Sequence, residues 1–222
     1  MKIVNGIAVL EDDSHISQWV IETNRLDHDQ YFLKHIDPFI PIGGVVLDIG
    51  AYIGDHTIYY LNKVGANGKV LAFEPNKRSF ECLNYNLGSY KNCQLFNNPV
   101  SNVKKYFDVV EPNENIGMAF IQDGKQVESI IIDDLNLDKV DFIKIDVEGF
   151  EIEVLEGCKK TLEKFSPTLI IEVNTHTLNR FGLSKENLFN KLKEMGYLFK
   201  NIYNWISITD SGDQFDILCT KA

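Results

Sequence analysis

The sequence contains neither a long apolar run nor a clustered set of cysteines. No segment approaches the roughly 18 apolar residues of a membrane-spanning helix, so we expect no membrane span. The opening residues, MKIVNGIAVLEDDSH, carry one lysine and a short apolar patch that soon meets acidic residues, which is unlike a signal peptide. We therefore expect a cytoplasmic protein. The cysteines form no Cys-x-x-Cys pair, which favours reduced structural thiols over a zinc site or a disulfide framework.

Basic residues are also scarce. The chain has 22 lysines and arginines against 32 aspartates and glutamates, and its net charge is −10 at pH 7. Nonspecific affinity for nucleic acid comes mainly from the neutralisation of phosphates by basic side chains. A broad nucleic-acid interface is therefore not expected, and a small or neutral molecule is the better candidate ligand. The length of 222 residues and the hydrophobic content of 44% suit a single globular domain that spans residues 1–222.

The most informative segment is VVLDIGAYIGDHT, residues 45–57. Its apolar start is typical of a strand buried on both faces of a parallel sheet, and the two glycines end that strand. Gly50 and Gly54 allow a ligand to approach the backbone closely, and Asp48 can accept a hydrogen bond at the end of the strand. This pattern indicates a nucleotide pocket, although a buried strand followed by a helix would explain it as well. The spacing is not the Gly-x-Gly-x-x-Gly of dinucleotide-binding turns.

A second short strand, KVLAF at residues 69–73, is followed directly by Glu74. Glu74 lies twenty residues after Gly54. In nucleotide-binding α/β domains an acidic residue in this place accepts hydrogen bonds from the ribose hydroxyls. A solvated loop charge is the alternative, but the interval from the first motif favours the ribose contact.

The third motif, DFIKIDVEGFEIEVLEG, starts at Asp141 and contains a charge inside a buried strand. Lys144 is costly to bury unless it is paired, and Asp146 lies two residues later on the same side of the strand. Asp146 also stands at the carboxyl end, where open α/β sheets place their ligands. Glu148 can join this charge network. The acidic residues that begin the next helix also favour its macrodipole, which needs no catalytic role.

The next predicted strand, residues 168–173, ends at Glu172 and is followed by His176. Adjacent strand ends would bring four side chains around one cleft, namely Asp146, Glu148, Glu172 and His176. Two chemical interpretations remain open. In the first, an imidazole or carboxylate removes a proton from a hydroxyl group, with Lys144, Asp146, Glu172 and His176 as the catalytic residues. In the second, Asp146, Glu148 and Glu172 hold a divalent cation such as magnesium.

Other segments complete the expected element order. We expect an N-terminal extension over residues 1–42 with a hairpin and two helices, and a small β insertion at about 104–132. Three histidines, His15, His28 and His35, occur in the extension; a surface imidazole is the commoner role for each, and His28 is the strongest of the three for a catalytic role. The polar stretch from Asn113 to Gly117 is either a pocket loop or a turn. Near the carboxyl end we expect strands at 197–201, 204–209 and 215–220, of which the last two form an antiparallel edge hairpin.

The segments VLDIGAYIGDHT, AFEPN and DFIKIDVEGFEIEVLEG resemble those of the FkbM-type methyltransferases, a class I family that uses S-adenosylmethionine. The resemblance extends from about residue 27 to residue 200. It implies a doubly wound α/β fold with a mostly parallel seven-stranded sheet, whose catalytic core spans residues 43–222. The family commonly has asparagine where this chain has Tyr52. The cofactor-binding residues implied by the resemblance are Asp48, Gly50, Ala51, Gly54, Thr57, Glu74 and, beside the adenine, Ser101.

The resemblance implies transfer of a methyl group from S-adenosylmethionine to a hydroxyl group of a small acceptor, such as a sugar, a glycan precursor or a natural-product precursor. Three alternatives remain open. The first is a nicotinamide oxidoreductase, which would need the Gly-x-Gly-x-x-Gly spacing that this chain lacks in its first motif. A non-catalytic module would bind the cofactor or a partner without turnover. A methyltransferase that acts on protein or nucleic acid is the third, and the Asn/Asp-Pro-Pro-Tyr/Phe motif typical of many amino-group methylating enzymes is missing after the fourth strand, where this chain has DVEG.

Overall fold

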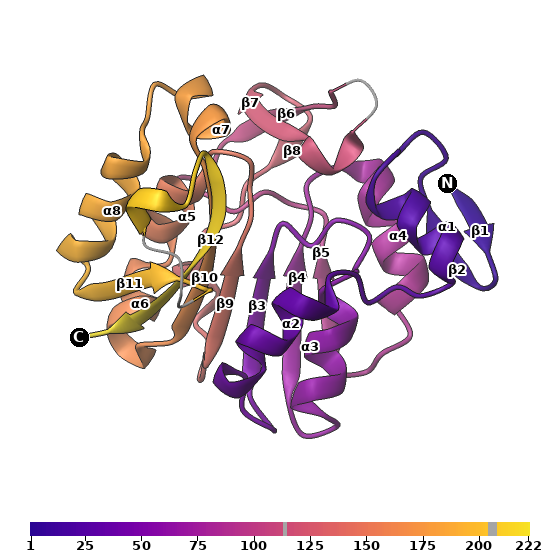
Figure 1. The fold of residues 1–222 in the computed structure, drawn as a ribbon, viewed down its shortest axis with the longest axis horizontal. Coiled ribbons are helices and arrows are strands. Elements are labelled where there is room, and N and C mark those ends of the chain that lie inside the picture. Colours follow the sequence, from indigo (N-terminus) through magenta and orange to yellow (C-terminus); the bar gives the residue numbers. More distant parts are fainter. Residues whose placement is uncertain (113–114, 204–207) are drawn as a thin grey trace.

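The computed structural model describes residues 1–112, 115–203 and 208–222, and it contains a mostly parallel seven-stranded sheet (Figure 1). The strand order is β11-β12-β10-β9-β3-β4-β5, and β12 runs in the direction opposite to the other strands of this sheet. This confirms the predicted fold class. The strands are β3 (Val45–Ile49), β4 (Lys69–Phe73), β5 (Cys93–Phe96), β9 (Phe142–Ile145), β10 (Thr168–Asn174), β11 (Tyr197–Asn201) and β12 (Gln214–Lys221).

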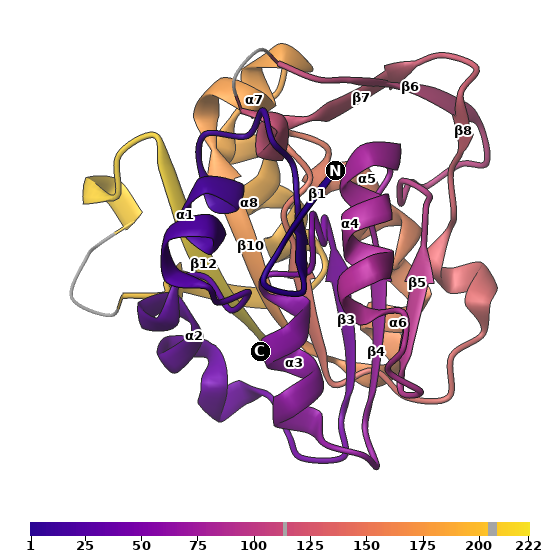
Figure 2. The same ribbon diagram turned by 90° about the vertical axis from the view of Figure 1, so that its right-hand side faces the viewer.

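Helices cover both faces of the sheet because the central strands are apolar on both sides. In β3, Leu47 and Ile49 pack against one helical layer, whereas Val46 packs against the other. The first layer contains α5 (Glu151–Gly157), α6 (Lys159–Phe165) and α8 (Lys185–Glu194). The second contains α2 (Gln30–Ile36), α3 (Thr57–Val64) and α4 (Lys77–Leu87), and Figure 2 shows α2 beside α3. A further short helix, α7 (Thr175–Arg180), follows β10 directly.

The order of the strands reverses at β3. The chain proceeds from β3 to β4 and β5 on one side, and then returns to β9 and β10 on the other. In open α/β sheets ligands bind at the carboxyl ends of the strands where the order reverses. The loops that follow β3 and β9 therefore occupy the expected place for a ligand site.

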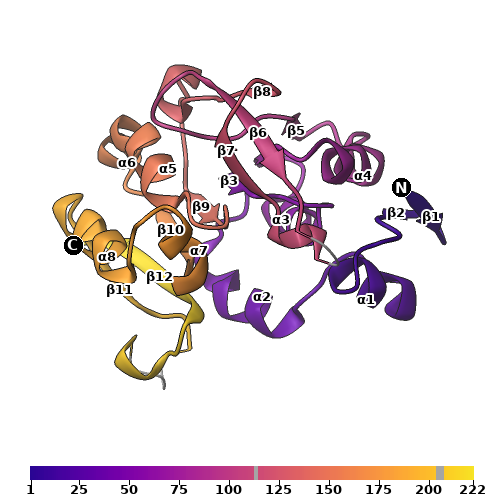
Figure 3. The same ribbon diagram turned by 90° about the horizontal axis from the view of Figure 1, so that it is seen from above.

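The predicted N-terminal extension and β insertion are both present. The extension contains a hairpin of β1 (Lys2–Val4) and β2 (Ile7–Val9), helix α1 (Ile16–Thr23), helix α2 and the 3-10 turn η1 (Asp37–Phe39). The insertion is a three-stranded antiparallel sheet of β6 (Tyr106–Val110), β7 (Phe120–Asp123) and β8 (Val127–Glu128), with the 3-10 turns η2 (Ile116–Met118) and η3 (Ile132–Leu135) beside it. Seen from above, β6 and β7 lie over the upper end of the main sheet (Figure 3).

The prediction of an edge hairpin formed by strands at 204–209 and 215–220 is wrong, because the second of these segments pairs with other strands. Residues 204–207 of the expected strand at 204–209 lie outside the described residues, and Ile208–Asp210 form a 3-10 turn, η4. Strand β12 instead lies between β10 and β11 and pairs with both. Its side chains explain this place, because Ile217 faces one helical layer and Leu218 faces the other. A strand with both faces covered belongs inside a sheet.

The described helices include none with the length and apolar character that a bilayer crossing requires.

Candidate functional site

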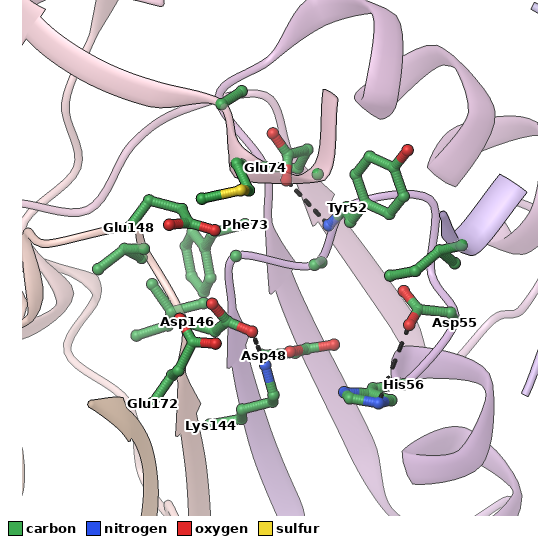
Figure 4. Close-up of a pocket in the computed structure, with 18 of the residues that line it drawn as sticks. Asp48, Tyr52, Asp55, His56, Phe73, Glu74, Lys144, Asp146, Glu148 and Glu172 are labelled. Atoms are coloured by element: carbon green, nitrogen blue, oxygen red, sulfur yellow. Dashed lines mark hydrogen bonds and ion pairs between the residues drawn. The ribbon is translucent and has the colours of Figure 1, made fainter. Parts of the chain in front are cut away.

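A cavity of about 630 Å³ lies at the carboxyl ends of β3, β4, β9 and β10 (Figure 4). This volume is within the range of about 300–1,000 Å³ that is usual for small-molecule sites. Three parts of the chain line it: the strand ends of the sheet, the N-terminal extension and the β insertion. The expected pocket loop contributes Ile116 and Gly117 to the lining, whereas Asn113 and Glu114 lie outside the described residues.

Asp48 lines the cavity from β3 and is buried. Its Oδ2 atom accepts a hydrogen bond from the Thr57 hydroxyl at 2.5 Å. Its Oδ1 atom is buried and has no hydrogen-bond partner among the described residues. Burial raises the pKa of Asp48 to about 6, while the positive charge of Lys144 opposes the rise. Asp48 therefore offers one unused acceptor atom to a ligand, and Thr57 positions its carboxylate.

Gly50 and Gly54 of the first motif are each required to be glycine, but for different structural reasons. Gly50 has a φ of +92°, and a Cβ added there would lie 1.7 Å from the backbone oxygen of Asp146. Gly54 has a φ of +95°, and its Cβ would lie 2.7 Å from the Leu87 side chain of α4. Gly50 and Ala51 line the cavity, whereas Gly54 is absent from the lining. Gly54 thus allows α4 to pack closely, and we find no ligand approach at this position.

Glu74 lies across the cavity from the β9 end, and two backbone amides hold its carboxylate. The amide of Tyr52 donates to Oε2 and the amide of Asn76 donates to Oε1, both at 2.8 Å (Figure 4 shows the first). Burial raises the pKa of Glu74 to about 7, and these two hydrogen bonds oppose the rise. Each carboxylate oxygen can accept one more hydrogen bond. The side chain is therefore oriented to bind two neighbouring hydroxyl groups.

Tyr52 adopts a left-handed backbone conformation with a φ of 47°. Asparagine tolerates this region better than tyrosine does, which gives a physical reason for the asparagine that is common here in the resembling family. The Tyr52 ring is 8% exposed and packs with the N-terminal extension and η2. Burial of the ring accompanies the strained backbone at this position.

The ion pair expected between Lys144 and Asp146 is present. The Lys144 ammonium lies 2.6 Å from Asp146 Oδ2, and the Lys144 side chain is only 3% exposed. Burial disfavours its charge most, but the attraction of Asp146, Asp48 and Asp216 and the hydrogen bond to Asp146 together hold the pKa of Lys144 above its usual value. Asp48 is the direct neighbour of Lys144 across the parallel pair β3–β9. The lysine thus stays charged between two carboxylates.

Asp146, Glu148 and Glu172 form an acidic cluster in which one oxygen of each lies within 4.8 Å of the others. The Oε2 atoms of Glu148 and Glu172 are buried and have no hydrogen-bond partner within the described parts of the chain. Burial, together with the Asp146 charge, raises the pKa of Glu148 to about 8 and holds the pKa of Glu172 well above its usual value. At neutral pH a cation near these groups would favour their ionised form.

His176 and Ser101 lie outside the cavity lining. Asn174 caps α7 by accepting from the His176 and Thr177 amides, so the chain turns into a helix just after Glu172. The His176 side chain is 80% exposed, and its Nε2 atom is 4.0 Å from Asp213. Ser101 is fully buried beneath the lining residue Val100. The structure therefore brings together Lys144, Asp146, Glu148 and Glu172 from the predicted cluster, without His176.

The lining also includes His28, Asp55, His56 and Asp216, which the motif analysis did not assign to the site. The sequence contains a signal for two of them, because Asp55 and His56 lie within the first motif. His28 comes from the extension, and no spacing rule places it over the sheet. Asp216 is the register partner of Glu172 in β12, and burial raises its pKa to about 7.

The cavity is strongly acidic. Lys144 is the only lysine or arginine among its described lining residues. The acidic residues of the lining are Asp13, Asp29, Asp48, Asp55, Glu74, Asp146, Glu148, Glu172 and Asp216. Such a lining favours a ligand that carries positive charge.

Comparisons with known proteins identify a family and a shared fold. The family described as "Methyltransferase FkbM domain" matches residues 48–199. Among solved structures, the methyltransferase FkbM of Methylobacillus flagellatus is 19% identical with a TM-score of 0.51, and the match covers 79% of this chain. This chain spans only 43% of the length of that protein. No curated protein gives a significant match.

Two other solved structures share the fold. The S-adenosylmethionine-dependent O-methyltransferase of Thermotoga maritima is 15% identical with a TM-score of 0.56, over 93% of this chain and 71% of that protein. The fibrillarin of Aeropyrum pernix, solved with natively bound S-adenosylmethionine, is 10% identical with a TM-score of 0.54, over 88% of this chain and 76% of that protein. At these identities the similarity shows the fold alone.

Proposed function

The chain belongs to the FkbM methyltransferase family, and from this premise we propose that it transfers the methyl group of S-adenosylmethionine to a hydroxyl oxygen of a small acceptor. The observation that carries the proposal is the Glu74 carboxylate, which two backbone amides orient toward an acidic cavity at the reversal point of the sheet. The carboxylate geometry fits a ribose diol. The acidic lining fits a cofactor that bears a sulfonium and an ammonium group.

The buried acceptor atoms without partners support this cofactor. The unpaired Asp48 Oδ1 atom suits the ammonium group of the methionine moiety. The backbone of Gly50 and Ala51 would pass beside the methionine moiety. The segment 98–100, just before Ser101, lines the part of the cavity in which the adenine would lie. In this assignment Thr57 supports Asp48, Gly54 supports the packing of α4, and Ser101 supports the adenine segment from below.

The acidic cluster would perform the proton transfer. When bound, the cofactor supplies an activated methyl group through its sulfonium charge. Glu172 accepts the proton of the acceptor hydroxyl, since burial and the Asp146 charge raise its pKa well above the usual value and so make its carboxylate a stronger base. Lys144 orients the Asp146 carboxylate through their 2.6 Å ion pair. The cavity orients donor and acceptor in line, which accelerates transfer.

A hard divalent cation is the second candidate arrangement for the same cluster. Asp146, Glu148 and Glu172 supply oxygen ligands of the kind that magnesium prefers, and two of these oxygens have no partner among the described residues. A cation held there would lower the pKa of an acceptor hydroxyl. Loss of turnover on addition of a chelator would favour this arrangement over Glu172 as the base.

Several features favour a neutral, small acceptor such as a sugar, a glycan precursor or a natural-product precursor over nucleic acid or protein. The cofactor and acceptor share about 630 Å³, and η2 and β7 of the insertion contribute to its lining. The acidic lining would repel phosphates. A non-catalytic module is less well supported, because Lys144 and the acidic cluster are costly to bury without a role.

The first experiment is a calorimetric titration with S-adenosylmethionine and with its demethylated product. We expect Glu74→Ala to weaken both by about 1–3 kcal/mol, the scale of hydrogen bonds to a charged group. Glu81→Ala, an exposed acid on α4, is the matched control and should bind normally. Binding of NAD instead would support the oxidoreductase alternative.

A screen of acceptors follows once the cofactor binds. Sugars, other polyols, RNA and peptides are compared by release of the demethylated product, with and without magnesium. Turnover of hydroxylated small molecules supports the proposal, and turnover of RNA or peptides alone overturns the acceptor assignment. Tight cofactor binding without turnover of any acceptor would favour the non-catalytic alternative.

A further inference from the structure

A second group of ligating side chains lines the cavity away from the acidic cluster. It consists of His28, which lies just before α2, and of Asp55 and His56, which lie just before α3. One ligating atom from each of the three residues lies within 4.8 Å of the other two. Figure 4 shows Asp55 and His56 on the opposite side of Asp48 and Lys144 from the cluster that contains Asp146.

Aromatic contacts hold the two imidazoles in place. The His56 ring stacks on Phe32, with centroids 5.0 Å apart and an interplanar angle of 16°. The His28 ring meets Trp19 edge to face, with centroids 4.9 Å apart and an angle of 83°. Because Phe32 lies in α2 and Trp19 in α1, the N-terminal extension determines where the histidines stand over the sheet. The three side chains are therefore presented by packed elements.

The Nε2 atom of His56 is buried and has no hydrogen-bond partner among the described residues. Buried polar side-chain atoms normally have one. Its neighbour, Asp55 Oδ2, is 3.9 Å away, which is too long for a hydrogen bond. The two residues are thus not arranged as a hydrogen-bonded proton-accepting dyad. A metal ion bound by both would give His56 Nε2 the partner that it lacks, since ligands bound at about 2.0–2.2 Å lie about 3–4 Å apart around one metal.

We propose that His28, Asp55 and His56 bind a divalent transition-metal ion whose remaining coordination positions face the cavity. Two imidazoles and one carboxylate suit zinc, iron, nickel or cobalt better than magnesium, which prefers oxygen ligands. Three protein ligands leave positions open for water or for an oxygen of a ligand. The acidic lining, with Asp48 and Asp216 nearby, raises the local concentration of cations.

The inference does not depend on methyl transfer, because it rests on the three side chains alone. It also differs from the magnesium arrangement above, which uses Asp146, Glu148 and Glu172. The two sites can be separated by substitution. Metal binding is therefore measured without S-adenosylmethionine, so that failure of this inference and failure of the proposed function remain distinguishable.

The test uses protein without a histidine tag, stripped with a chelator, and titrated with Co²⁺ by visible absorption and with Zn²⁺ by calorimetry. We expect one equivalent of each metal to bind. His28→Ala, Asp55→Asn and His56→Gln should each weaken binding at least tenfold, since loss of even an outer partner of a metal ligand costs about 10–100-fold. His176→Ala removes an exposed histidine outside the cavity and should bind like the unmodified chain.

Thermal unfolding of each variant establishes that it folds. His28 is only half-buried, so His28→Ala provides a variant that should fold even if substitution of the buried Asp55 disrupts the loop. The proposal is overturned if the unmodified chain binds neither metal stoichiometrically. It is also overturned if His28→Ala retains full affinity, or if Glu172→Gln abolishes binding while His28→Ala does not.

Discussion

Gly50 and Asp146 meet backbone to backbone, although 96 positions separate them in the sequence. Each lies two residues beyond a register pair, because Asp48 and Lys144 are direct neighbours on β3 and β9. The Asp146 carbonyl oxygen occupies the space that a Gly50 Cβ would need, at 1.7 Å. This contact joins the first and third motifs, and both residues line the cavity.

Gly50→Ala should therefore destabilise the protein and abolish cofactor binding. The substitution combines a left-handed backbone with a clash against backbone atoms that cannot rotate away, and we expect a loss of about 3 kcal/mol or more in the free energy of unfolding. Gly182→Ala is the matched control, since its φ is +70° and no atom lies within 4 Å of its added Cβ. The control should lose only about 1–2 kcal/mol in urea unfolding. Equal losses would contradict the assigned clash.

The parallel core could be predicted because its signals are local. The apolar runs before Asp48, Glu74 and Asp146, each ended by a glycine, a proline or a charge, indicate buried parallel strands. The place of β12 could not be predicted in this way. Its insertion between β10 and β11 depends on burial of both faces by helices that are distant in sequence.

Lys144→Met should be among the most destabilising substitutions in the sheet. Removal of the ammonium leaves the buried Asp48 and the partly exposed Asp146 without a counter-charge, which we expect to cost about 3–5 kcal/mol. The exposed pair Lys105–Asp123 has the same 2.6 Å separation, with side chains 41% and 83% exposed. Lys105→Met should therefore cost less than about 1 kcal/mol. Chemical unfolding of both variants at pH 7 makes the comparison. Similar costs would contradict the role of burial.

The ligand-free protein should lose stability as the pH rises from about 5 to 8. Burial raises the pKa of Glu74 and of Asp216 to about 7 in the folded state. The folded protein therefore binds more protons than the unfolded chain between the unfolded and folded pKa values, so the free energy of unfolding falls across this window. Above the folded-state pKa values, these two groups should cause no further fall in the free energy of unfolding.

Thermal unfolding at constant ionic strength across this range measures the effect. Asp216→Asn removes one contributor while keeping the shape of the side chain, so its pH profile should be shallower than that of the unmodified chain. A stability that rises between pH 5 and 8 would show that other groups dominate. S-adenosylmethionine, if it binds as proposed, should reduce the decline by favouring the ionised acids.

The cavity lining could be predicted where a residue follows its strand directly, as Glu74 and Asp146 do. Prediction was less informative where a helix begins soon after the strand, because the cap at Asn174 redirects His176 to the surface. The sequence could not show that His28 lines the cavity, because its place depends on how the N-terminal extension packs against α3. Side chains brought in by such packing carry no fixed spacing in the sequence.

Glu172 and His176 provide the sharpest test of the proposed proton transfer. Glu172→Gln keeps the side chain's size and its contact with Gln214, but it removes the carboxylate that would accept the hydroxyl proton. We expect kcat to fall by about 10²–10⁴-fold, the usual contribution of a general base, with little change in cofactor affinity. His176→Ala should retain most of the activity, because its imidazole is 80% exposed and lies outside the cavity lining. The opposite result, a large loss in His176→Ala and a small one in Glu172→Gln, would assign the base to the histidine and require α7 to move toward the cavity during the reaction.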